Sequence, residues 1–213
     1  MNRIKIFISC LFIIPFCSNA QSWKPAGNFN LNGGISRMYY DSLMNKLIVG
    51  TTADTLGGVP VDHIALWNGN NWSAFGAGLN ITVQSITDLD GTIYVAGTNH
   101  KIYKWDGMSW SVFAQANGPI YVIKAFNHKL YVGGYFLKIN GVTVNSLGVW
   151  NGTNWASVGG GVSGGSYTVY CLENSDTSLF VGGCYLTVGG ITVNNIARWD
   201  GTTWHSLGTG ASF

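Results

Sequence analysis

The stretch Leu130–Val162, LYVGGYFLKINGVTVNSLGVWNGTNWASVGGGV, contains most of one unit of the pattern that decides the fold. A second version, LFVGGCYLTVGGITVNNIARWDGTTWHSLGTG, runs from Leu179 to Gly210. Both have the same order: a VGG segment, an insert, a short apolar run, and two tryptophans around an Asn-Gly or Asp-Gly pair. Because self-similarity along a chain indicates a repeat architecture, this pattern is interpreted before any single residue.

Four tryptophan segments mark four such units. Each unit predicts four short antiparallel strands, because Asn-Gly and Asp-Gly accept the positive φ of a tight hairpin turn. In the third unit the strands are expected at 120–126, 129–135, 146–150 and 155–158, and the turn then brings Trp150 and Trp155 close to cross-strand register. The segments are WNGNNW from Trp67, WDGMSW from Trp105, WNGTNW from Trp150 and WDGTTW from Trp199.

A repeated four-stranded antiparallel unit of about 40–50 residues is typical of a propeller blade. The sequence therefore predicts an all-β fold, a β-propeller with blades at approximately 23–72, 72–110, 110–155 and 155–210. Trp23 begins a segment that matches a fourth strand, although the last blade already has its own at Trp204. Two interpretations stay open: a four-bladed ring with one strand displaced, or an incomplete ring from a larger propeller. Unpaired terminal blades would favour association.

The two quoted segments resemble the repeats of exported bacterial kelch-like, galactose-oxidase-type β-propeller proteins. The resemblance covers nearly all of residues 23–210. Many such proteins end in a C-terminal sorting domain of the type IX secretion pathway, which this sequence lacks up to Phe213. The resemblance implies an architecture and not a ligand, because fold and function are separable. It brings no copper site, since no Tyr/His ligand motif can be matched residue by residue.

Residues 1–20 have the pattern of a signal peptide. Arg3 and Lys5 precede an apolar run, 6–16, that is too short to span a bilayer. Ser18 and Ala20 are small residues at the positions that a signal peptidase recognises, which predicts cleavage after Ala20. The mature domain is then 21–213. The alternative is a lipoprotein anchored through Cys17, but the residues before that cysteine are not small. We expect an extracellular or outer-cell-surface location, with the periplasm as the alternative.

Composition excludes several classes of function. Charged residues make up 9% of the chain and the formal net charge is +2; removing Arg3 and Lys5 leaves no net charge, which argues against a nucleic-acid partner. No membrane span is expected in the mature chain. The sequence has no Ser-His-Asp constellation, phosphate-binding glycine loop or EF-hand loop, and Glu173 is its single glutamate. We therefore expect no catalytic residues and no cofactor.

The tryptophans, histidines and cysteines each have a structural interpretation. The tryptophans recur in every unit, which favours packing over sugar binding. The histidines form no metal-ligand motif, so no metal site is expected. Cys171 and Cys184 fall on adjacent strands in a diagonal arrangement, which leaves a disulfide and two small buried residues as alternatives. The tryptophans are Trp67, Trp72, Trp105, Trp110, Trp150, Trp155, Trp199 and Trp204, and the histidines are His63, His100, His128 and His205.

The insert between the second and third strands differs most between units. It reads TLGGVPVDH, FLKINGVTVNS and YLTVGGITVNN, and it is nearly absent from the second unit. Its Gly-containing pairs predict hairpins that project on one rim, and loops on a rigid scaffold commonly carry binding. The candidate ligand-binding residues are Asp62, His63, Asn140, Asn145, Asn194 and Asn195.

These observations predict an exported or cell-surface scaffold that binds an unknown protein or glycan without catalysis. One alternative is a carbohydrate-binding or carbohydrate-active propeller domain. Convergent carboxylates in the central channel would favour an enzyme. Another alternative is a structural segment of a larger surface protein.

Overall fold

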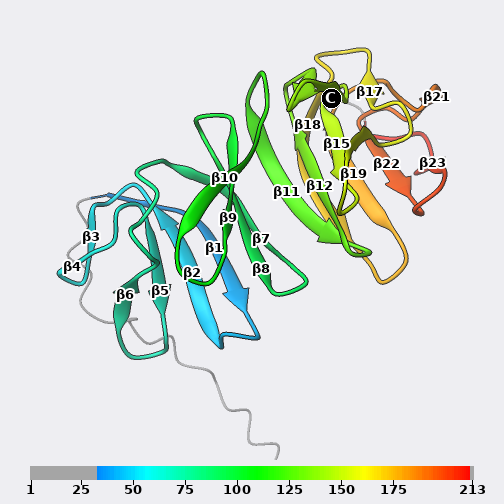
Figure 1. The fold of residues 1–213 in the computed structure, drawn as a ribbon. Coiled ribbons are helices and arrows are strands. Elements are labelled where there is room, and N and C mark those ends of the chain that lie inside the picture. The colour runs from blue at the N-terminus through cyan, green and yellow to red at the C-terminus, as the bar shows by residue number, and fades with distance from the viewer. Residues whose placement is uncertain (1–32, 212–213) are drawn as a thin grey trace, which may run out of the picture.

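The computed structural model describes residues 33–211, and every regular element in that range is a strand. The predicted signal peptide, Cys17 and the Trp23 segment lie outside the described residues. Four four-stranded antiparallel sheets follow one another along the chain, one for each sequence repeat (Figure 1). We number the repeats 1 to 4 in chain order.

Within each sheet the strands are hydrogen-bonded in sequence order, with the inserted hairpin left out. Repeat 1 contains β1 (Ile35–Asp41), β2 (Lys46–Thr51), β5 (Ile64–Trp67) and β6 (Trp72–Ala74). Repeat 2 contains β7 (Val83–Leu89), β8 (Thr92–Gly97), β9 (Lys101–Trp105) and β10 (Trp110–Gln115). Repeat 3 contains β11 (Ile120–Phe126), β12 (Lys129–Gly134), β15 (Leu147–Trp150) and β16 (Trp155–Ser157). Repeat 4 contains β18 (Thr168–Asn174), β19 (Leu179–Cys184), β22 (Ile196–Trp199) and β23 (Trp204–Ser206).

The strands expected in repeat 3 are confirmed, and no strand end differs from the prediction by more than one residue. The turn prediction is confirmed as well. Gly152, between β15 and β16, has a φ of 97°, a conformation that glycine adopts without steric cost. As a result Trp150 lies directly opposite Trp155 in the sheet register.

The inserts of repeats 1, 3 and 4 form two-stranded hairpins, as predicted. They do not project freely, because the second residue of each hairpin, Leu56, Ile139 or Val188, is fully buried. The chain leaving one repeat also pairs with the hairpin of the next: Ala116 bridges to Ile139, and β17 (Val162–Ser163) pairs with β20. The hairpins are β3 (Thr55–Leu56) with β4 (Val59–Pro60), β13 (Lys138–Ile139) with β14 (Val142–Thr143), and β20 (Thr187–Val188) with β21 (Ile191–Thr192).

The hydrophobic core lies between successive sheets. The first strands of the repeats pack in series, β1 on β7, β7 on β11 and β11 on β18. Close approach requires glycine in the VGG segments: a Cβ at Gly133 would lie 2.5 Å from Cγ1 of Val169 in the next repeat. Polar side chains join the same strands, since Ser85 Oγ accepts from the amide of Ile123 at 3.0 Å and Thr87 Oγ1 accepts from that of Ala125 at 3.1 Å.

In repeats 2, 3 and 4 the paired tryptophans pack against the preceding repeat. In each repeat the two indoles are direct cross-strand partners, with ring centroids 4.9 to 5.6 Å apart. Trp110 Nε1 donates to the carbonyl of Phe75, and Trp204 Nε1 donates to that of Val158. A Cβ at Gly76 would lie 2.5 Å from the indole of Trp105, so glycine makes room for the ring. These contacts account for the recurrence of tryptophan in every unit.

The outward side of the first strand, β1, is apolar and exposed. Ile35, Met38 and Tyr40 are 40%, 68% and 58% exposed. In repeats 2, 3 and 4 the first strand has a preceding repeat to pack on, and β1 has none within residues 33–211. The same range contains no helix that is long and apolar enough to cross a membrane.

Candidate functional site

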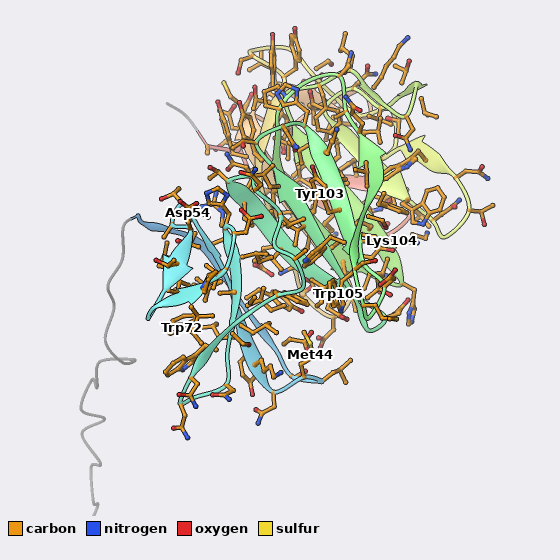
Figure 2. All side chains as sticks on the ribbon, turned by 60° about the vertical axis from the view of Figure 1, so that its left-hand side comes forward. Met44, Asp54, Trp72, Tyr103, Lys104 and Trp105 are labelled. Atoms are coloured by element: carbon orange, nitrogen blue, oxygen red, sulfur yellow. The ribbon has the colours of Figure 1, made fainter. Side chains whose placement is uncertain are left out.

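Each repeat has two ends at which a ligand could meet loops. We call the end with the inserted hairpins (55–60, 138–143 and 187–192) the hairpin face. The opposite end, with the turns that join first and second strands (42–45, 90–91, 127–128 and 175–178), is the turn face. Figure 2 shows Asp54 and Met44 near opposite ends of repeat 1, on the hairpin and turn faces respectively.

The predicted rim residues lie where the hairpins return to the sheet. Asp62, Asn145 and Asn194 occupy equivalent positions in their repeats. Their φ angles are all positive, at 45°, 51° and 47°. The following residues, His63, Ser146 and Asn195, also have positive φ. Asparagine and aspartate tolerate this conformation better than most residues, so a structural role explains why they occur here.

The amides of the predicted asparagines are engaged within the protein. Asn145 and Asn194 donate from Nδ2 to the carbonyls of Gly160 and Thr209, at 3.2 and 2.8 Å. Asn195 donates to Ala211 and accepts from the amide of Tyr185. Asn140 Oδ1 accepts from the amide of Gln115. These hydrogen bonds fasten the loops of the hairpin face, so the four asparagines named as candidate ligand-binding residues also have a structural role.

Asp62 and His63 differ from the other candidates. Their side chains lie beside Asp54, and the three residues offer ligand atoms that all fall within 4.8 Å of one another. Three converging ligands were not expected from the sequence, because Asp54 lies on the far side of the hairpin. An alignment of the repeats shows the signal: Asp54 stands where repeats 3 and 4 have Leu137 and Leu186. This group is the one in the described range that could hold a metal ion.

A pair of stacked tyrosines dominates the hairpin face between repeats 3 and 4. The rings of Tyr135 and Tyr167 lie 5.2 Å apart with an interplanar angle of 24°, and their hydroxyls are 3.3 Å apart. The two residues are 44% and 36% exposed. Tyr167 has a φ of 42°, which is unusual for a bulky residue and points to a constraint at this position. The hydrogen bond to Tyr135 raises the pKa of Tyr167.

A cavity of about 330 Å³ adjoins this pair. Its lining has no acidic side chain, lysine or arginine. Asn117 Oδ1 accepts from the amides of Leu137 and Lys138, which leaves its Nδ2 group without a partner among residues 33–211. The walls therefore combine flat apolar surface with a few oriented polar groups, the composition typical of a small-ligand site. The lining residues are His100, Asn117, Gly118, Pro119, Tyr135, Phe136, Leu137 and Tyr167.

A second hollow, of about 360 Å³, adjoins the first one on the hairpin face. Leu137 and Tyr167 contribute to both hollows, and Asn145 and Ser163 supply polar groups to the second. A further tyrosine pair, Tyr121 and Tyr170, lies between the same two repeats, with ring centroids 5.5 Å apart. Tyrosine surface is thus concentrated where repeats 3 and 4 meet. Sequence reasoning missed this site because Tyr135 and Tyr167 belong to different units.

The turn face carries a polar cavity of about 490 Å³. The carboxylate of Asp88 accepts from the amide of Gly91 at 3.0 Å and so caps the turn after β7. Burial raises the pKa of Asp88, and the charges of Asp41 and Asp90 raise it further. His128 is exposed, and its Nδ1 lies 2.8 Å from Asp90 Oδ1. Asp88 therefore serves a turn and Asp90 contacts His128, while Asp176 also lines the cavity.

Cys171 and Cys184 are free cysteines in the structure, and the disulfide that the sequence left open is not formed. The register explains this result: Cys171 lies opposite Gly182, whereas Cys184 lies opposite Thr168. The two residues are therefore diagonal neighbours and not a direct pair. Hydrogen bonds with Ser166 lower the pKa of the Cys184 thiol.

Comparison with known proteins identifies fold relatives only. No family model and no curated protein matches the chain. The computationally designed protein Ika8 is similar over 83% of this chain and 49% of its own, with 13% identity and a TM-score of 0.51. The designed protein Ika4 is similar over 84% and 99%, with 11% identity and a TM-score of 0.52.

An extracellular domain from B. thetaiotaomicron is also similar in structure. It belongs to BT4673, which is described as a one-component system, and it matches with 12% identity and a TM-score of 0.50. The match covers 84% of this chain and 23% of that domain. This chain therefore spans about half of Ika8 and about a quarter of the extracellular domain. At such identities the likeness concerns the fold alone: an all-β array of four-stranded antiparallel sheets.

Proposed function

We propose that this chain is an exported repeat protein of the kelch-like β-propeller type that binds a ligand on its hairpin face without catalysis. The serial packing of first strands supports the propeller arrangement, since blades of a propeller meet in this way. Export is supported by the signal-peptide pattern of residues 1–20 and by the extracellular location of the BT4673 domain.

One observation carries the location of the site: the exposed, stacked pair of Tyr135 and Tyr167 beside a cavity of about 330 Å³. Exposed aromatic rings combine a large contact area with a small loss of conformational entropy on binding. Scattered apolar residues on a surface need no explanation, but a stacked pair at a hollow does.

The ligand class that fits is a neutral sugar. The apolar face of a pyranose ring can stack on a tyrosine ring, and its hydroxyls need the donors that Asn117 Nδ2 and the tyrosine hydroxyls supply. No carboxylate, lysine or arginine lines the cavity, which favours a neutral ligand over a strongly charged one. This moves the glycan hypothesis from the tryptophans, which are packed, to the tyrosines.

The positions of Asp88 and Asp90 on the turn face favour a binding role over a glycosidase role in which these two are the catalytic pair. Hydrolysis of a glycosidic bond generally requires two carboxylates that face each other across a cleft. Asp88 and Asp90 instead lie two residues apart around a strand end, one capping a turn and the other paired with His128.

The test is glycan-array screening of the chain, followed by calorimetry with the neutral oligosaccharides that bind. Replacing Tyr135 or Tyr167 with alanine should weaken binding about tenfold or more, the scale of one aromatic contact. Tyr40→Ala is the matched control, because Tyr40 is exposed on repeat 1 and lines neither hollow. The proposal is wrong if no neutral glycan binds, or if both tyrosine variants bind as tightly as the wild type.

A further inference from the structure

The base of the repeat 1 hairpin brings three side chains of metal-binding type together. Asp54 precedes the hairpin, whereas Asp62 and His63 follow it, and their ligand atoms lie within 4.8 Å of one another. His63 Nε2 is 3.5 Å from Asp54 Oδ1, too far for a hydrogen bond. The His63 side chain is only 20% exposed. Its Nδ1 atom is buried and has no hydrogen-bond partner among residues 33–211.

The backbone that holds these residues is the same in three repeats. The carbonyl of Asp54 accepts from the amides of Val61 and Asp62, at 2.8 and 3.4 Å. The carbonyl of Leu137 accepts in the same way from residues 144 and 145, at 2.8 and 3.3 Å, and that of Leu186 from residues 193 and 194, at 2.9 and 3.4 Å. Repeats 3 and 4 are therefore internal controls, which hold other side chains on the same frame.

Repeat 1 departs from these controls at all three positions. It has Asp54, Asp62 and His63 where repeat 4 has Leu186, Asn194 and Asn195. The departures remove structural hydrogen bonds: a carboxylate cannot donate as Asn194 does to Thr209, and His63 makes neither of the bonds that Asn195 makes. Loss of such bonds costs stability unless the new side chains gain something else.

The new side chains also place two carboxylates close together. Two carboxylates approach within 4.8 Å, and the described residues place no lysine, arginine or hydrogen-bond donor on them apart from the distant contact with His63. Like charges at this separation repel, and a bound cation removes the repulsion. We propose that Asp54, Asp62 and His63 form a binding site for a divalent transition-metal ion at the base of the β3–β4 hairpin.

The donor set indicates the kind of ion. One imidazole nitrogen with two carboxylate oxygens suits Zn²⁺ and its neighbours, whereas Ca²⁺ and Mg²⁺ prefer oxygen ligands alone. The backbone fixes the frame, since Gly78 packs so closely on Asp62 that a Cβ at residue 78 would lie 2.2 Å from Asp62 Cβ. The side chain of Asp54 is 75% exposed, so an ion can reach the site from solvent and water can occupy its remaining coordination positions.

The experiment is titration of Zn²⁺ into the full chain, purified without a polyhistidine tag, by calorimetry and thermal unfolding. We expect one Zn²⁺ per chain and a rise in Tm, and Co²⁺ should give the visible absorption of a bound ion. The test variants introduce the residues of repeat 4: Asp54→Leu, Asp62→Asn and His63→Asn. Each should weaken Zn²⁺ binding by more than about tenfold, because even second-shell losses reach that size.

These variants should fold, since repeat 4 holds the same residues on the same backbone. Circular dichroism without metal checks this point. His205→Asn is the matched control, because His205 also faces an aspartate, Asp200 at 2.6 Å, but without a second carboxylate. The proposal is overturned if Zn²⁺ does not bind, if His63→Asn binds it as the wild type does, or if His205→Asn loses it instead. Preference for Ca²⁺ over Zn²⁺ would also overturn it.

Discussion

The hairpin bases of repeats 1 and 4 have the same backbone hydrogen bonds and different side chains. In repeat 4, Asn194 and Asn195 use their amides to fasten the following loop. In repeat 1, Asp62 and His63 occupy those positions and turn toward Asp54. The frame common to both repeats therefore consists of carbonyls and amides of the main chain, and the side chains at these positions differ. In a repeat protein, departures from the shared pattern identify candidate chemistry better than the pattern itself.

The largest expected effect comes from breaking the shared frame. Ile139 is fully buried at the base of the repeat 3 hairpin, at the position of Leu56 and Val188. Ile139→Ala should lower the free energy of unfolding by about 2–5 kcal/mol, because it leaves a cavity in the core. Val142→Ala, on the exposed strand of the same hairpin, should change it by no more than about 0.5 kcal/mol. Equal effects in denaturant unfolding would show that the hairpin is not part of the core.

A smaller effect is expected from making repeat 3 resemble repeat 1. Asn145→Asp removes the hydrogen bond from Nδ2 to the carbonyl of Gly160. The free energy of unfolding should fall by about 0.5–1.5 kcal/mol. The reverse change, Asp62→Asn, should raise stability in the absence of metal. Urea unfolding in the presence of EDTA measures the free energy of unfolding of both variants. A stability gain in Asn145→Asp would contradict the structural role of the amide.

Asp88 is a departure in repeat 2, where repeat 3 has Ala125. Burial is the main cause of its raised pKa, so the folded state binds the proton more readily than the unfolded state does. The ionised carboxylate therefore lowers the free energy of unfolding. This loss develops as pH rises from the pKa of Asp88 in the unfolded state to its higher pKa in the folded state. Asp88→Asn keeps an acceptor for Gly91 and should stabilise the chain by roughly 0.5 kcal/mol at pH 7. The gain should vanish in acid, as thermal unfolding across pH can show.

The smallest effect concerns the turns between third and fourth strands, where repeat 4 has Asp200 and repeat 3 has Asn151. His205 is the main cause of the lowered pKa of Asp200, with help from the amides of Thr203 and Thr202. The ionised group therefore adds stability above its unfolded pKa, and this is lost as pH falls through the folded pKa. Asp200→Asn should slightly lower Tm at neutral pH. A Tm difference that persists in strong acid would contradict this assignment.

Much of the fold could be predicted from the repeated pattern, because the pattern is local. The Asn-Gly and Asp-Gly turns set the register of the tryptophan pairs, and the VGG segments marked the close approach of strands. The hairpins were also expected, but their burial against the preceding repeat was not. Burial of Ile139 depends on a bridge to Ala116, which belongs to another unit.

The candidate sites were less predictable. Asp62 and His63 were named from the sequence, whereas Asp54 was not, since nothing in the spacing across the hairpin showed that it returns to them. Tyr135 and Tyr167 were missed entirely. Each is unremarkable in its own unit, and the cavity beside them is lined by residues from more than one repeat.

The sequence by itself determined the all-β class, the number of repeats, the strands within each unit and the register of the tryptophan pairs. The reason is that turn residues and period-two alternation act over a few residues. The tertiary structure alone decided which side chains from different units or hairpin ends meet: Tyr135 with Tyr167, and Asp54 with His63. Those meetings depend on how one sheet packs on the next and how each hairpin folds back, which no local pattern specifies.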